Sequence, residues 1–528
     1  MDGARPGPRA STGLAAVVVV LAFVPAVAWG QANTAGPLTQ LTGFNALEQE
    51  AAAANQAIYN ALTTPVGAGG PNGGGVPVCS PNTPVTGAGG CVGQVLSVFN
   101  NVRALVATAS QLLTGRPNQY SLGADQQHLG FALRWTAAEE VLEQGSIARR
   151  FANNQSSALS THVAAIRAVS RLGLRASNAI DDPAGTALAA TVAAVGGGAS
   201  ADASNGGLTR WGLFAGSAGG WGDHKPTDYE DAFIYTGQEY SGGLDYRFSN
   251  SLVGGVVVGG AKRKVRFDPN QSVVNGGIDS TGTSGLVFLQ FDRPHFYATA
   301  SIGLQALRYD ITRAIEYGSN NPLADSVYAV TQGRTNSTSR LATLNLGVPF
   351  ESKSFSADLY VKADYQGITI DAFHEQKVAG FSTGFNQDVG EQKLKSVDVA
   401  VGFKLQAVWA PHFAVLVPYL RGEVHRELAN QAESLSTLYG FLNGPGAALP
   451  AQVQSLLASA NFKLSSEPFK PNFYIATAGI SAVLRGSQRI SADGVAHGGL
   501  QGYIEYSQAF KLSNFSNHVL SGGLRYEF

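Results

Sequence analysis

The sequence is poor in sulfur and in charge. Its 528 residues include two cysteines and one methionine, too few soft ligands for a thiolate metal cluster. Charged residues make up 14% of the chain, against about 25% in ordinary soluble domains. Acidic and basic residues number 37 and 36, so no basic excess is available to neutralise phosphates, and no nucleic-acid partner is expected.

Glycine and apolar residues are plentiful instead. There are 64 glycines, and 44% of the residues are hydrophobic, which is enough apolar surface to exclude a disordered chain. A chain of this length is expected to form at least two units. A glycine-rich, weakly charged composition favours an extended β architecture over a soluble enzyme.

The first thirty residues have the order of a secretory signal peptide. Arg5 and Arg9 precede an apolar run over 14–27, and small residues then allow cleavage between Ala28 and Ala32. The run is shorter than the ~20 apolar residues of a membrane anchor. We therefore expect residues 1–31 to be a signal peptide and the rest to be an exported protein without a spanning helix.

From residue 209 onward, the sequence alternates between apolar and polar residues with a period of two, as half-buried strands do. In DLYVKADY, for example, Leu359 and Val361 oppose Tyr360, Lys362 and Asp364. Aromatic residues cluster at strand ends, where the interfacial girdles of membrane barrels lie. The predicted strands cover residues 209–221, 237–249, 251–265, 281–292, 295–309, 337–350, 355–368, 394–409, 413–427, 471–485, 499–510 and 517–528.

The connections between these strands differ in length. Short turns are expected on the periplasmic side at 248–252, 291–296, 350–355, 409–413 and 510–515. Long polar connections are expected outside at 222–236, 266–280, 310–336, 369–393, 428–470 and 486–498. An even number of strands with alternating short and long connections predicts an all-β, twelve-stranded antiparallel transmembrane β-barrel, with its charged faces lining the lumen.

Several segments of this region also resemble a known family. The opening WGLFAGSAGGWGD, the strand VPYLRGEVHRE and the closing HVLSGGLRYEF are similar to the β-domain of monomeric autotransporters of type V secretion. The resemblance covers residues 209–528 and implies a twelve-stranded barrel with a helix threading the pore. It also implies a barrel-assembly signal in the last strand, carried by Leu520, Leu524, Tyr526 and Phe528.

The same resemblance implies a localisation and partners. The chain would be exported by the general secretion machinery, accompanied by periplasmic chaperones and inserted by the barrel-assembly machinery. It would then contact the lipid of the bacterial outer membrane as a monomeric barrel, with its N-terminal passenger at the cell surface.

The region before the barrel departs from the family pattern, in which passengers are usually long β-helices. Residues 32–183 read as a short helical passenger, with helical spacing over 44–62, 92–113 and 125–175 and a Gly/Pro-rich loop between the first two. Residues 184–208 read as a Gly/Ala-rich linker. The segment 136–178 is either a helix that plugs the barrel, held by lumen acids such as Asp245, Asp364 and Glu423, or a surface helix of the passenger.

The two cysteines, Cys79 and Cys91, lie in the Gly/Pro-rich loop. A cysteine pair in an exported chain is expected to form a disulfide, which would contribute roughly 3 kcal/mol for a loop of this length. Two free thiols are the alternative. No histidine lies nearby to complete a metal site.

No catalytic constellation is found. The passenger lacks the Gly-Asp-Ser motif of esterase relatives, and the chain has neither a Gly-Asp-Ser-Gly nor an HExxH motif. Asp493 and His497 lie four positions apart but have no placed nucleophile. We therefore expect no enzymatic activity, no cofactor and no metal. Some relatives release their passenger by cyclisation of an asparagine in the pore, and the pair Asn153-Asn154 resembles that cleavage site, although asparagine pairs are also common in ordinary helices.

Together these features predict an outer-membrane autotransporter whose C-terminal barrel translocates or displays a small helical passenger. The alternative is a structural or channel-like outer-membrane barrel whose N-terminal segment stays periplasmic or plugs the lumen. A secreted hydrolase is the third class, and the missing nucleophile motif disfavours it.

Overall fold

The structure is a computed structural model of the whole chain. It describes residues 33–66, 76–81, 91–178, 211–249, 251–267, 273–352, 355–409, 411, 415–429, 434–440, 449–466, 470–485, 489–490, 496–497, 499–512 and 514–527. The predicted signal peptide, the predicted linker, Asp493 and Phe528 lie outside these residues.

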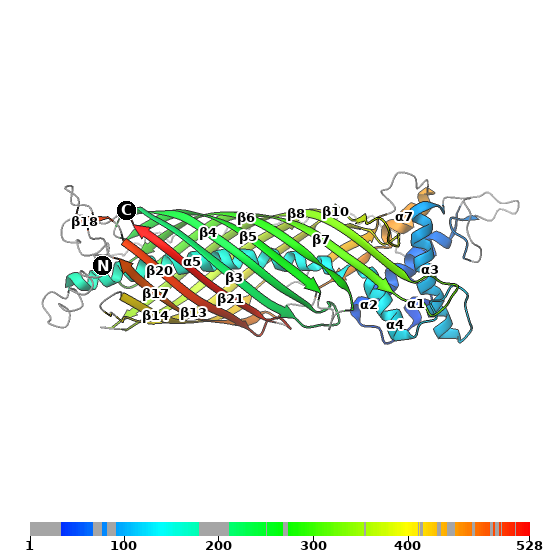
Figure 1. Cartoon of the computed structure of the whole chain (residues 1–528), viewed down its shortest axis with the longest axis horizontal. Helices are drawn as coiled ribbons and strands as arrows, with labels where there is room; N and C mark the ends of the chain where they lie inside the picture. Colours follow the sequence, from blue (N-terminus) through cyan, green and yellow to red (C-terminus); the bar gives the residue numbers. More distant parts are fainter. Residues whose placement is uncertain are drawn as a thin grey trace, which may run out of the picture.

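Twelve long antiparallel strands close into a barrel (Figure 1). Each strand pairs with the next in the sequence order given below, and the last, β21, pairs with the first, β3, so that Leu524 faces Ala215. The predicted fold class and the twelve predicted strands are therefore confirmed. The strands are β3 (Trp211–His224), β4 (Phe233–Ser249), β5 (Leu252–Phe267), β6 (Asn275–Asp292), β7 (Tyr297–Tyr317), β8 (Val327–Glu351), β9 (Phe355–Ile370), β13 (Gln392–Ala407), β14 (Val415–Glu427), β17 (Asn472–Arg485), β20 (Gly499–Phe510) and β21 (Asn517–Glu527).

Apolar residues of the strands face outward and polar residues face the lumen, as predicted. On β9, Leu359 and Val361 point outward with 52% and 49% of their surface exposed, whereas Tyr360 and Asp364 are buried in the lumen. The same holds for β21, on which Leu520 and Leu524 are outward and Arg525 is buried. The apolar face therefore meets the membrane and the polar face lines the interior.

Three strands are much longer than predicted. β6, β7 and β8 continue past the apolar belt and pair with one another to their ends, as at Tyr317 and Val327. Outward residues in these extensions are polar, among them Asp310 and Thr312, while inward Tyr309 and Ile311 remain buried. Because apolar residues continue on the inward face only, the predicted strands for β6 and β8 began too late and the one for β7 ended too early.

Two connections are on the opposite side from that predicted. The described residues between β17 and β20 include β18 (Arg489–Ile490), which lies at the end of the barrel that holds the C-terminus (Figure 1). The connection between β20 and β21 lies at the other end, where Ser516 N donates to Asp223 O at 2.9 Å. Successive strands of the barrel are antiparallel, so connections alternate between its two ends. β14 runs toward the cap, and β17, whose Asn472 pairs with Arg426, therefore runs back toward the C-terminal end. Connection length alone gave the wrong side for this pair.

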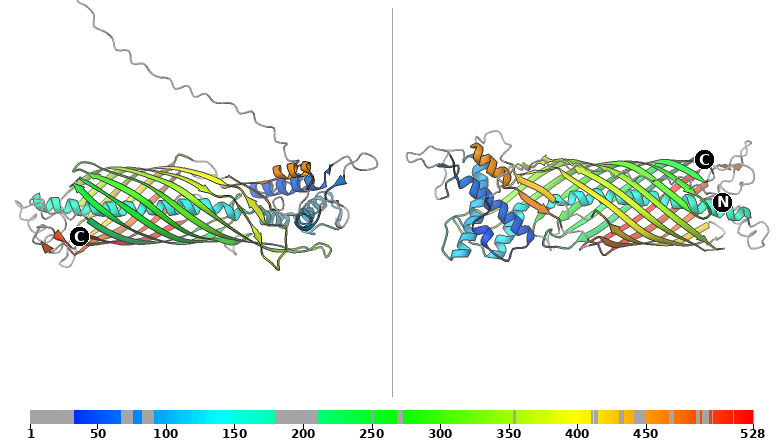
Figure 2. Two further views of the ribbon diagram at one scale, coloured as in Figure 1. Left: turned by 90° about the horizontal axis from the view of Figure 1, so that it is seen from above. Right: turned by 180° about the vertical axis from the view of Figure 1, so that it is seen from behind.

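A helical cap covers the other end of the barrel (Figures 1 and 2). Four of its helices precede the barrel in sequence: α1 (Pro37–Gln40), α2 (Ala46–Thr63), α3 (Gly93–Thr114) and α4 (Gln126–Ala137). The long connections supply the rest, which the sequence did not predict: α7 (Ala451–Ser459) and a four-stranded sheet of β10 (Phe373–His374), β12 (Gln387–Val389), β15 (Ser434–Tyr439) and β16 (Phe462–Ser465). The short strand β11 (Gln376–Lys377) pairs with β8.

Local signals explain where the cap helices begin and end. Asn45 and Glu48 form a capping box at the start of α2, and the Asp125 side chain caps α4. α3 ends at Gly115, which adopts the left-handed conformation with φ of 67°. Within the predicted Gly/Pro-rich loop, two short antiparallel strands pair with each other: β1 (Pro65–Val66) and β2 (Val76–Pro77).

The predicted helix over 125–175 is interrupted at Ala138, which has a φ of 58°. A short turn, η1 (Glu139–Leu142), then leads into α5 (Glu143–Asn178). α5 runs along the barrel interior, from the cap toward the C-terminal end (Figure 2). The plug interpretation of this segment is therefore confirmed. Among the described helices, none is both long and apolar enough to cross a membrane.

Candidate functional site

The site consists of the lumen with the helix α5 inside it and the cap above it. One side of α5 is apolar: Leu159, Val163 and Ile166 are at most 4% exposed. These side chains form a core with inward residues of β3, β5 and β6, namely Phe214, Val253, Val257, Leu286 and Phe288. Burial of this stripe holds the helix against one wall of the barrel.

The other side of α5 is polar and hydrogen bonds to lumen acids. Ser156 Oγ donates to Asp364 Oδ1 at 3.1 Å, and Thr161 Oγ1 donates to Glu505 Oε1 at 3.1 Å. Asn154 Nδ2 donates to Glu239 Oε1 at 3.0 Å. Hydrogen bonds to charged groups contribute about 1.5–3 kcal/mol each, so these contacts fix the helix at a definite depth and rotation.

His162 of α5 also contacts a lumen acid. Its Nε2 lies 3.3 Å from Asp245 Oδ2, and its ring stacks on Phe214 with centroids 3.6 Å apart. Asp245 also accepts from Arg525 Nη2 at 2.6 Å. The imidazole is thus held between an acid of β4 and an aromatic ring of β3.

All three acids predicted for the lumen lie there, and two of them contact α5 as predicted. These two are Asp245 and Asp364, whereas Glu423 accepts from Tyr360 OH at 2.8 Å within the wall. Two arginines of α5 lie over aromatic rings: Arg150 over the Phe515 ring at 3.6 Å and Arg167 over the Tyr297 ring at 3.6 Å. Arg167 also pairs with another lumen acid, Asp358, Nη2 to Oδ2 at 3.8 Å. Stacking on aromatic faces suits a planar guanidinium group.

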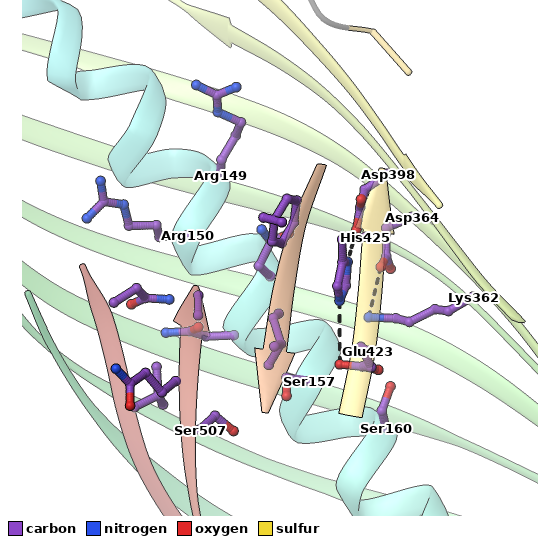
Figure 3. A pocket seen from close by; sticks show the side chains of 18 of the residues that line it. Arg149, Arg150, Ser157, Ser160, Lys362, Asp364, Asp398, Glu423, His425 and Ser507 are labelled. Carbon is purple, nitrogen blue, oxygen red and sulfur yellow. Dashed lines mark hydrogen bonds and ion pairs between the residues drawn. The ribbon is translucent and has the colours of Figure 1, made fainter. Parts of the chain in front are cut away.

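A cavity of about 300 Å³ remains between the polar side of α5 and the wall formed by β9, β13 and β14 (Figure 3). Two ion pairs lie in its polar lining: His425 Nδ1 lies 2.6 Å from Asp398 Oδ2, and Lys362 Nζ lies 2.8 Å from Asp364 Oδ2. Figure 3 shows Ser157 and Ser160 of α5 facing this wall. Among the described residues, neither hydroxyl is hydrogen bonded to His425, so this imidazole does not activate a serine of α5 as a nucleophile.

Asn153 and Asn154 also line this cavity. Both lie in the interior of α5, where Asn153 Oδ1 accepts from Gln366 Nε2 and Asn154 donates to Glu239. The two side chains are therefore held by opposite walls of the barrel. Cyclisation at Asn154 would need its Nδ2 to leave Glu239 and reach the backbone carbonyl carbon of the same residue.

The cap and the barrel share one hydrophobic core. Inward residues at the cap end of the barrel, such as Tyr309 and Ile315, belong to the same buried cluster as Phe99 of α3 and Leu133 of α4. Residues of α7 and β16, including Leu457 and Phe462, complete the cluster. A continuous core makes the cap and the barrel mouth one folded unit rather than two tethered ones.

Directional contacts reinforce this core. Gln94 Nε2 of α3 donates to Asn386 Oδ1 at 2.5 Å, and Gln387 Nε2 donates to the Thr136 carbonyl at 2.6 Å. At the far side of the cap, Asn321 Nδ2 in the β7–β8 connection donates to the Ser121 carbonyl at 2.7 Å. Each of these hydrogen bonds joins a cap helix, or the chain beside it, to a connection of the barrel.

A group of buried charges lies where α4 and η1 meet the barrel connections. Arg134 pairs with Asp231 of the β3–β4 connection, and Arg313 of β7 pairs with Glu375, Nε to Oε1 at 2.7 Å. Burial, with nearby Asp231, raises the pKa of Glu139 well above its usual value. Burial also raises the pKa of Glu140 to about 7, against the opposing effect of Arg313.

Cys79 and Cys91 are joined in a disulfide, with their Cα atoms 5.3 Å apart. Both are fully buried in the shared core. The backbone N–H of Cys79 donates to the Leu62 carbonyl at 2.9 Å. The disulfide therefore ties the start of α3 to the end of α2.

The structure describes most of the remaining predicted site residues. Leu520, Leu524 and Tyr526 form an outward apolar row on β21, with 47%, 56% and 45% of their surfaces exposed. Phe528 and Asp493 lie outside the described residues, and His497 lies in β19 (Ala496–His497) at the C-terminal end. Within the described ranges, no cluster of His, Cys, Asp or Glu has the arrangement of a metal site.

Several contact residues were missed from the sequence. Glu239 and Glu505 lie on inward faces of β4 and β20, where they accept hydrogen bonds from Asn154 and Thr161 of α5. His162 of α5 contacts Asp245. The lumen position of the two acids could have been predicted, because a carboxylate on the polar face of an alternating strand points into the lumen. No local signal gives the helix partners, because they depend on how deeply α5 is inserted.

Residues 213–467 match the family model of the autotransporter β-domain. In fold, the chain is similar to the translocator domain of the autotransporter NalP from Neisseria meningitidis, with 15% identity over 62% of this chain and 92% of that one and a TM-score of 0.41. It is also similar to the β-domain of the Bordetella autotransporter BrkA (14% identity, 60% of this chain, 100% of that one, TM-score 0.38). The transport unit of AIDA-I from Escherichia coli gives 11% identity over 62% and 93% of the two chains, with a TM-score of 0.35. No curated protein matches the chain in sequence.

Proposed function

The chain belongs to the autotransporters through its C-terminal β-domain, and from this premise we propose that its barrel displays the helical cap at the cell surface as a permanently attached, non-enzymatic domain. The barrel itself is an outer-membrane protein, and its family generally depends on the barrel-assembly machinery for insertion. The proposal concerns the cap: it stays folded on the barrel mouth instead of being released.

The shared core is the observation that carries this proposal. Release of the cap would divide a buried apolar cluster that joins cap helices to inward barrel residues such as Tyr309 and Ile315. Exposing such side chains costs about 25 cal/mol for each Å² of apolar surface. Attachment through α5, which hydrogen bonds to several strands, adds a second restraint on release.

The direction of display follows from the chain path. The cap end carries most of the long connections, which face outside in bacterial barrels, and the C-terminus lies at the other end. We propose that residues 1–31 are removed as a signal peptide after export by the general secretion machinery. The segment 184–208 would then link the end of α5 to β3 on the periplasmic side, with chaperones holding the chain before insertion.

The outward row on β21 supports an assembly role for the last strand. Leu520, Leu524 and Tyr526 form a continuous apolar surface, and β21 is also the strand that closes the barrel against β3. We propose that this row, with Phe528, is the surface recognised by the assembly machinery. An unclosed edge in hydrocarbon would leave backbone groups unpaired, each at a cost of several kcal/mol.

Cleavage at Asn153-Asn154 is the competing proposal for the fate of the cap. It would leave the first part of α5 with the cap and the rest in the lumen. The mass of the mature protein distinguishes the two: one intact chain supports permanent display, and two fragments meeting at residue 153 or 154 would overturn it. An Asn153→Gln, Asn154→Gln variant is the control, since it should abolish only a genuine cleavage.

Thiol labelling of intact cells tests the display itself. Arg116 is exposed on the cap and Ser249 is exposed at the C-terminal end of the barrel, while the native cysteines are buried in their disulfide. A membrane-impermeant maleimide should modify an Arg116→Cys variant in intact cells and a Ser249→Cys variant only after permeabilisation. Labelling of neither variant in intact cells would contradict surface display, and labelling of Ser249→Cys alone would reverse the orientation.

A channel-like role is the second candidate, favoured by the cavity beside α5. We expect the helix and the cap to keep conductance low in a planar bilayer. A high steady conductance of the intact protein would favour the channel over display.

A further inference from the structure

The outer wall of the barrel is apolar along its membrane belt and becomes basic on the cap side of that belt. Outward residues such as Val258, Leu304 and Leu344 give way to exposed basic residues farther along the same strands. These residues form what we call the cationic sector: Lys262, Lys264 and Arg266 on β5, Arg308 on β7, Arg334 and Arg340 on β8, and Lys395 on β13.

The depth of the sector coincides with the edge of the hydrocarbon. Lys262 is ten positions from Leu252, which begins β5, and Arg308 is ten positions from Ala298 at the start of β7. Arg340 is likewise ten positions from Phe350 on β8. A tilted strand crosses the hydrocarbon in about 9–11 residues, so these three side chains lie where the lipid headgroups begin.

Strand register brings the cations of neighbouring strands together. Gly367 of β9 pairs with Arg340 on one side and with Lys395 on the other. In the same way, Thr281 of β6 separates Lys262 from Arg308. Adjacent strands are about 4.8 Å apart, so each pair is roughly 10 Å apart across one intervening strand and could contact the same headgroup.

The acids of this wall neutralise only part of the sector. Asp279 pairs with Arg266 at 2.7 Å, and Asp310 pairs with Arg334 at 2.5 Å and approaches Arg308 at 4.0 Å. For Lys262, Lys264, Arg340 and Lys395, no carboxylate in the described part of the chain lies within ion-pairing distance. These four side chains therefore leave an uncompensated positive charge.

The opposite wall differs at the same level. There, the exposed outward residues of β3, β4 and β20 include the aromatic Trp221, Tyr240 and Tyr506 and the uncharged Gln238, which pairs with Lys262. Over the described residues of β3, β4, β20 and β21, no lysine or arginine points outward. Among the described strands, the outward lysines and arginines are therefore concentrated on the side formed by β5 to β14, where Arg426 is also exposed.

We propose that the cationic sector binds the phosphorylated headgroup of an outer-leaflet lipid, whose acyl chains lie along Val258, Leu304 and Leu344. Unpaired lysine and arginine side chains just beyond an apolar belt match the charge and the depth of a phosphate attached to acyl chains. A lipid satisfies both surfaces at once, whereas a free phosphate would use only the charged one.

Binding of diphosphoryl lipid A to the detergent-folded full chain, followed by native mass spectrometry, tests the proposal. The variant changes Lys262, Lys264, Arg340 and Lys395 to Gln. The control removes the same charge from exposed sites outside the sector, by Arg116→Gln, Lys225→Gln, Arg293→Gln and Lys377→Gln. Each lost cation should weaken binding about fivefold, so the sector variant should lose affinity by roughly a hundredfold or more while the control stays within about twofold of the parent chain.

Two further arms separate the possible ligands. The same glycolipid with both phosphates removed should bind the parent chain as weakly as diphosphoryl lipid A binds the sector variant. Inorganic phosphate should not compete at equal concentration, because it lacks the acyl chains. The proposal is wrong if the sector and control variants lose affinity equally, if dephosphorylation has no effect, or if inorganic phosphate displaces the lipid; an unchanged heat-dependent gel shift verifies that every variant is folded.

Discussion

The hydroxyl group of Tyr439 donates a hydrogen bond to Asn55 Oδ1 at 3.0 Å, and the two residues are 384 positions apart. Tyr439 ends β15 in the last long connection of the barrel, and Asn55 lies in α2, near the start of the chain. Both side chains are fully buried. The contact means that the cap is completed only when the first helices meet a connection formed late in the barrel.

Removing that hydroxyl should weaken the cap. In a Tyr439→Phe variant, Asn55 Oδ1 is left buried without this donor, which costs about 1–3 kcal/mol. Trp135 lies in the cap, so its fluorescence during urea unfolding reports on the cap once Trp211, Trp221 and Trp409 on the barrel are changed to Phe. Tyr328→Phe makes the same chemical change at an exposed site and should leave the transition unmoved. Equal shifts of the unfolding midpoint in the two variants would mean that the hydrogen bond to Asn55 does not stabilise the cap.

The cap should lose stability as the pH rises from about 4.5 to 7. Burial raises the pKa of Glu140 from 4.5 to about 7, so in this range the unfolded chain releases a proton that the folded chain retains. The free energy of unfolding therefore decreases with pH, by roughly 3 kcal/mol for this group, and is constant again above about pH 7.

A Glu140→Gln variant should show a smaller pH dependence in the same Trp135 measurement. It should match the parent chain near pH 4.5 and exceed it in stability at pH 8, because the amide has no proton to lose. Glu316→Gln on β7, an exposed site, serves as the control. A slope that does not change in Glu140→Gln would show that other groups cause the pH dependence.

Opening the disulfide should destabilise the cap and spare the barrel. Changing Cys79 and Cys91 to Ala removes a constraint worth roughly 3 kcal/mol for a loop of this length. The Trp135 transition should move to lower urea by a matching amount, while the heat-dependent gel shift of the barrel persists. Loss of both signals together would mean that the barrel cannot form without this disulfide.

Charge on the outward face of β9 should be penalised according to depth. Leu359→Arg places a cation inside the apolar belt and should cost about 2–4 kcal/mol, whereas Tyr365→Arg lies near the level of Arg340 and should cost about 0–1 kcal/mol. Reversible unfolding of the barrel from lipid vesicles measures both. Equal costs would place the edge of the hydrocarbon elsewhere on this strand.

The last strand should be more sensitive than an equivalent internal strand. Changing Leu520, Leu524, Tyr526 and Phe528 to Ser should block insertion into the outer membrane, as judged by cell fractionation and the heat-dependent gel shift. The control changes Leu359, Val361 and Tyr365 to Ser, which removes a similar outward surface from β9. If both variants fail to insert alike, outward hydrophobicity in general would explain the defect and the assembly signal would not.

The barrel could be predicted from the sequence because the alternation of outward and inward residues depends only on neighbouring positions in a strand. Leu359 and Tyr360 differ in environment only because neighbouring residues of a strand face opposite sides, and this repeats in all twelve strands. The extensions of β6, β7 and β8 were missed since Arg308 and Asp310 replace apolar residues on the outward face, although the strand continues. Apolar alternation marks the membrane belt better than it marks the strand.

The contacts of the candidate site could not be predicted from local sequence patterns in the same way. That Asp245 lies in the lumen follows from alternation, but that it meets His162 depends on the depth of α5, which many contacts fix together. The pairing of Asn55 with Tyr439 has no local signal at all. Nor do α7 and β16 show the pattern of independent elements, because they are stabilised by the cap on which they pack.

The position of α5 gives the molecule the topology of a rotaxane. The helix is an axle inside a ring closed by the β21–β3 pairing, and the cap at one end is about as broad as the barrel itself (Figure 2). A folded cap of that breadth cannot be drawn back through a lumen that α5 already fills. Once the cap has folded, the axle and the ring are therefore mechanically interlocked, and they can separate only if the cap unfolds, the ring opens or the peptide chain is cut.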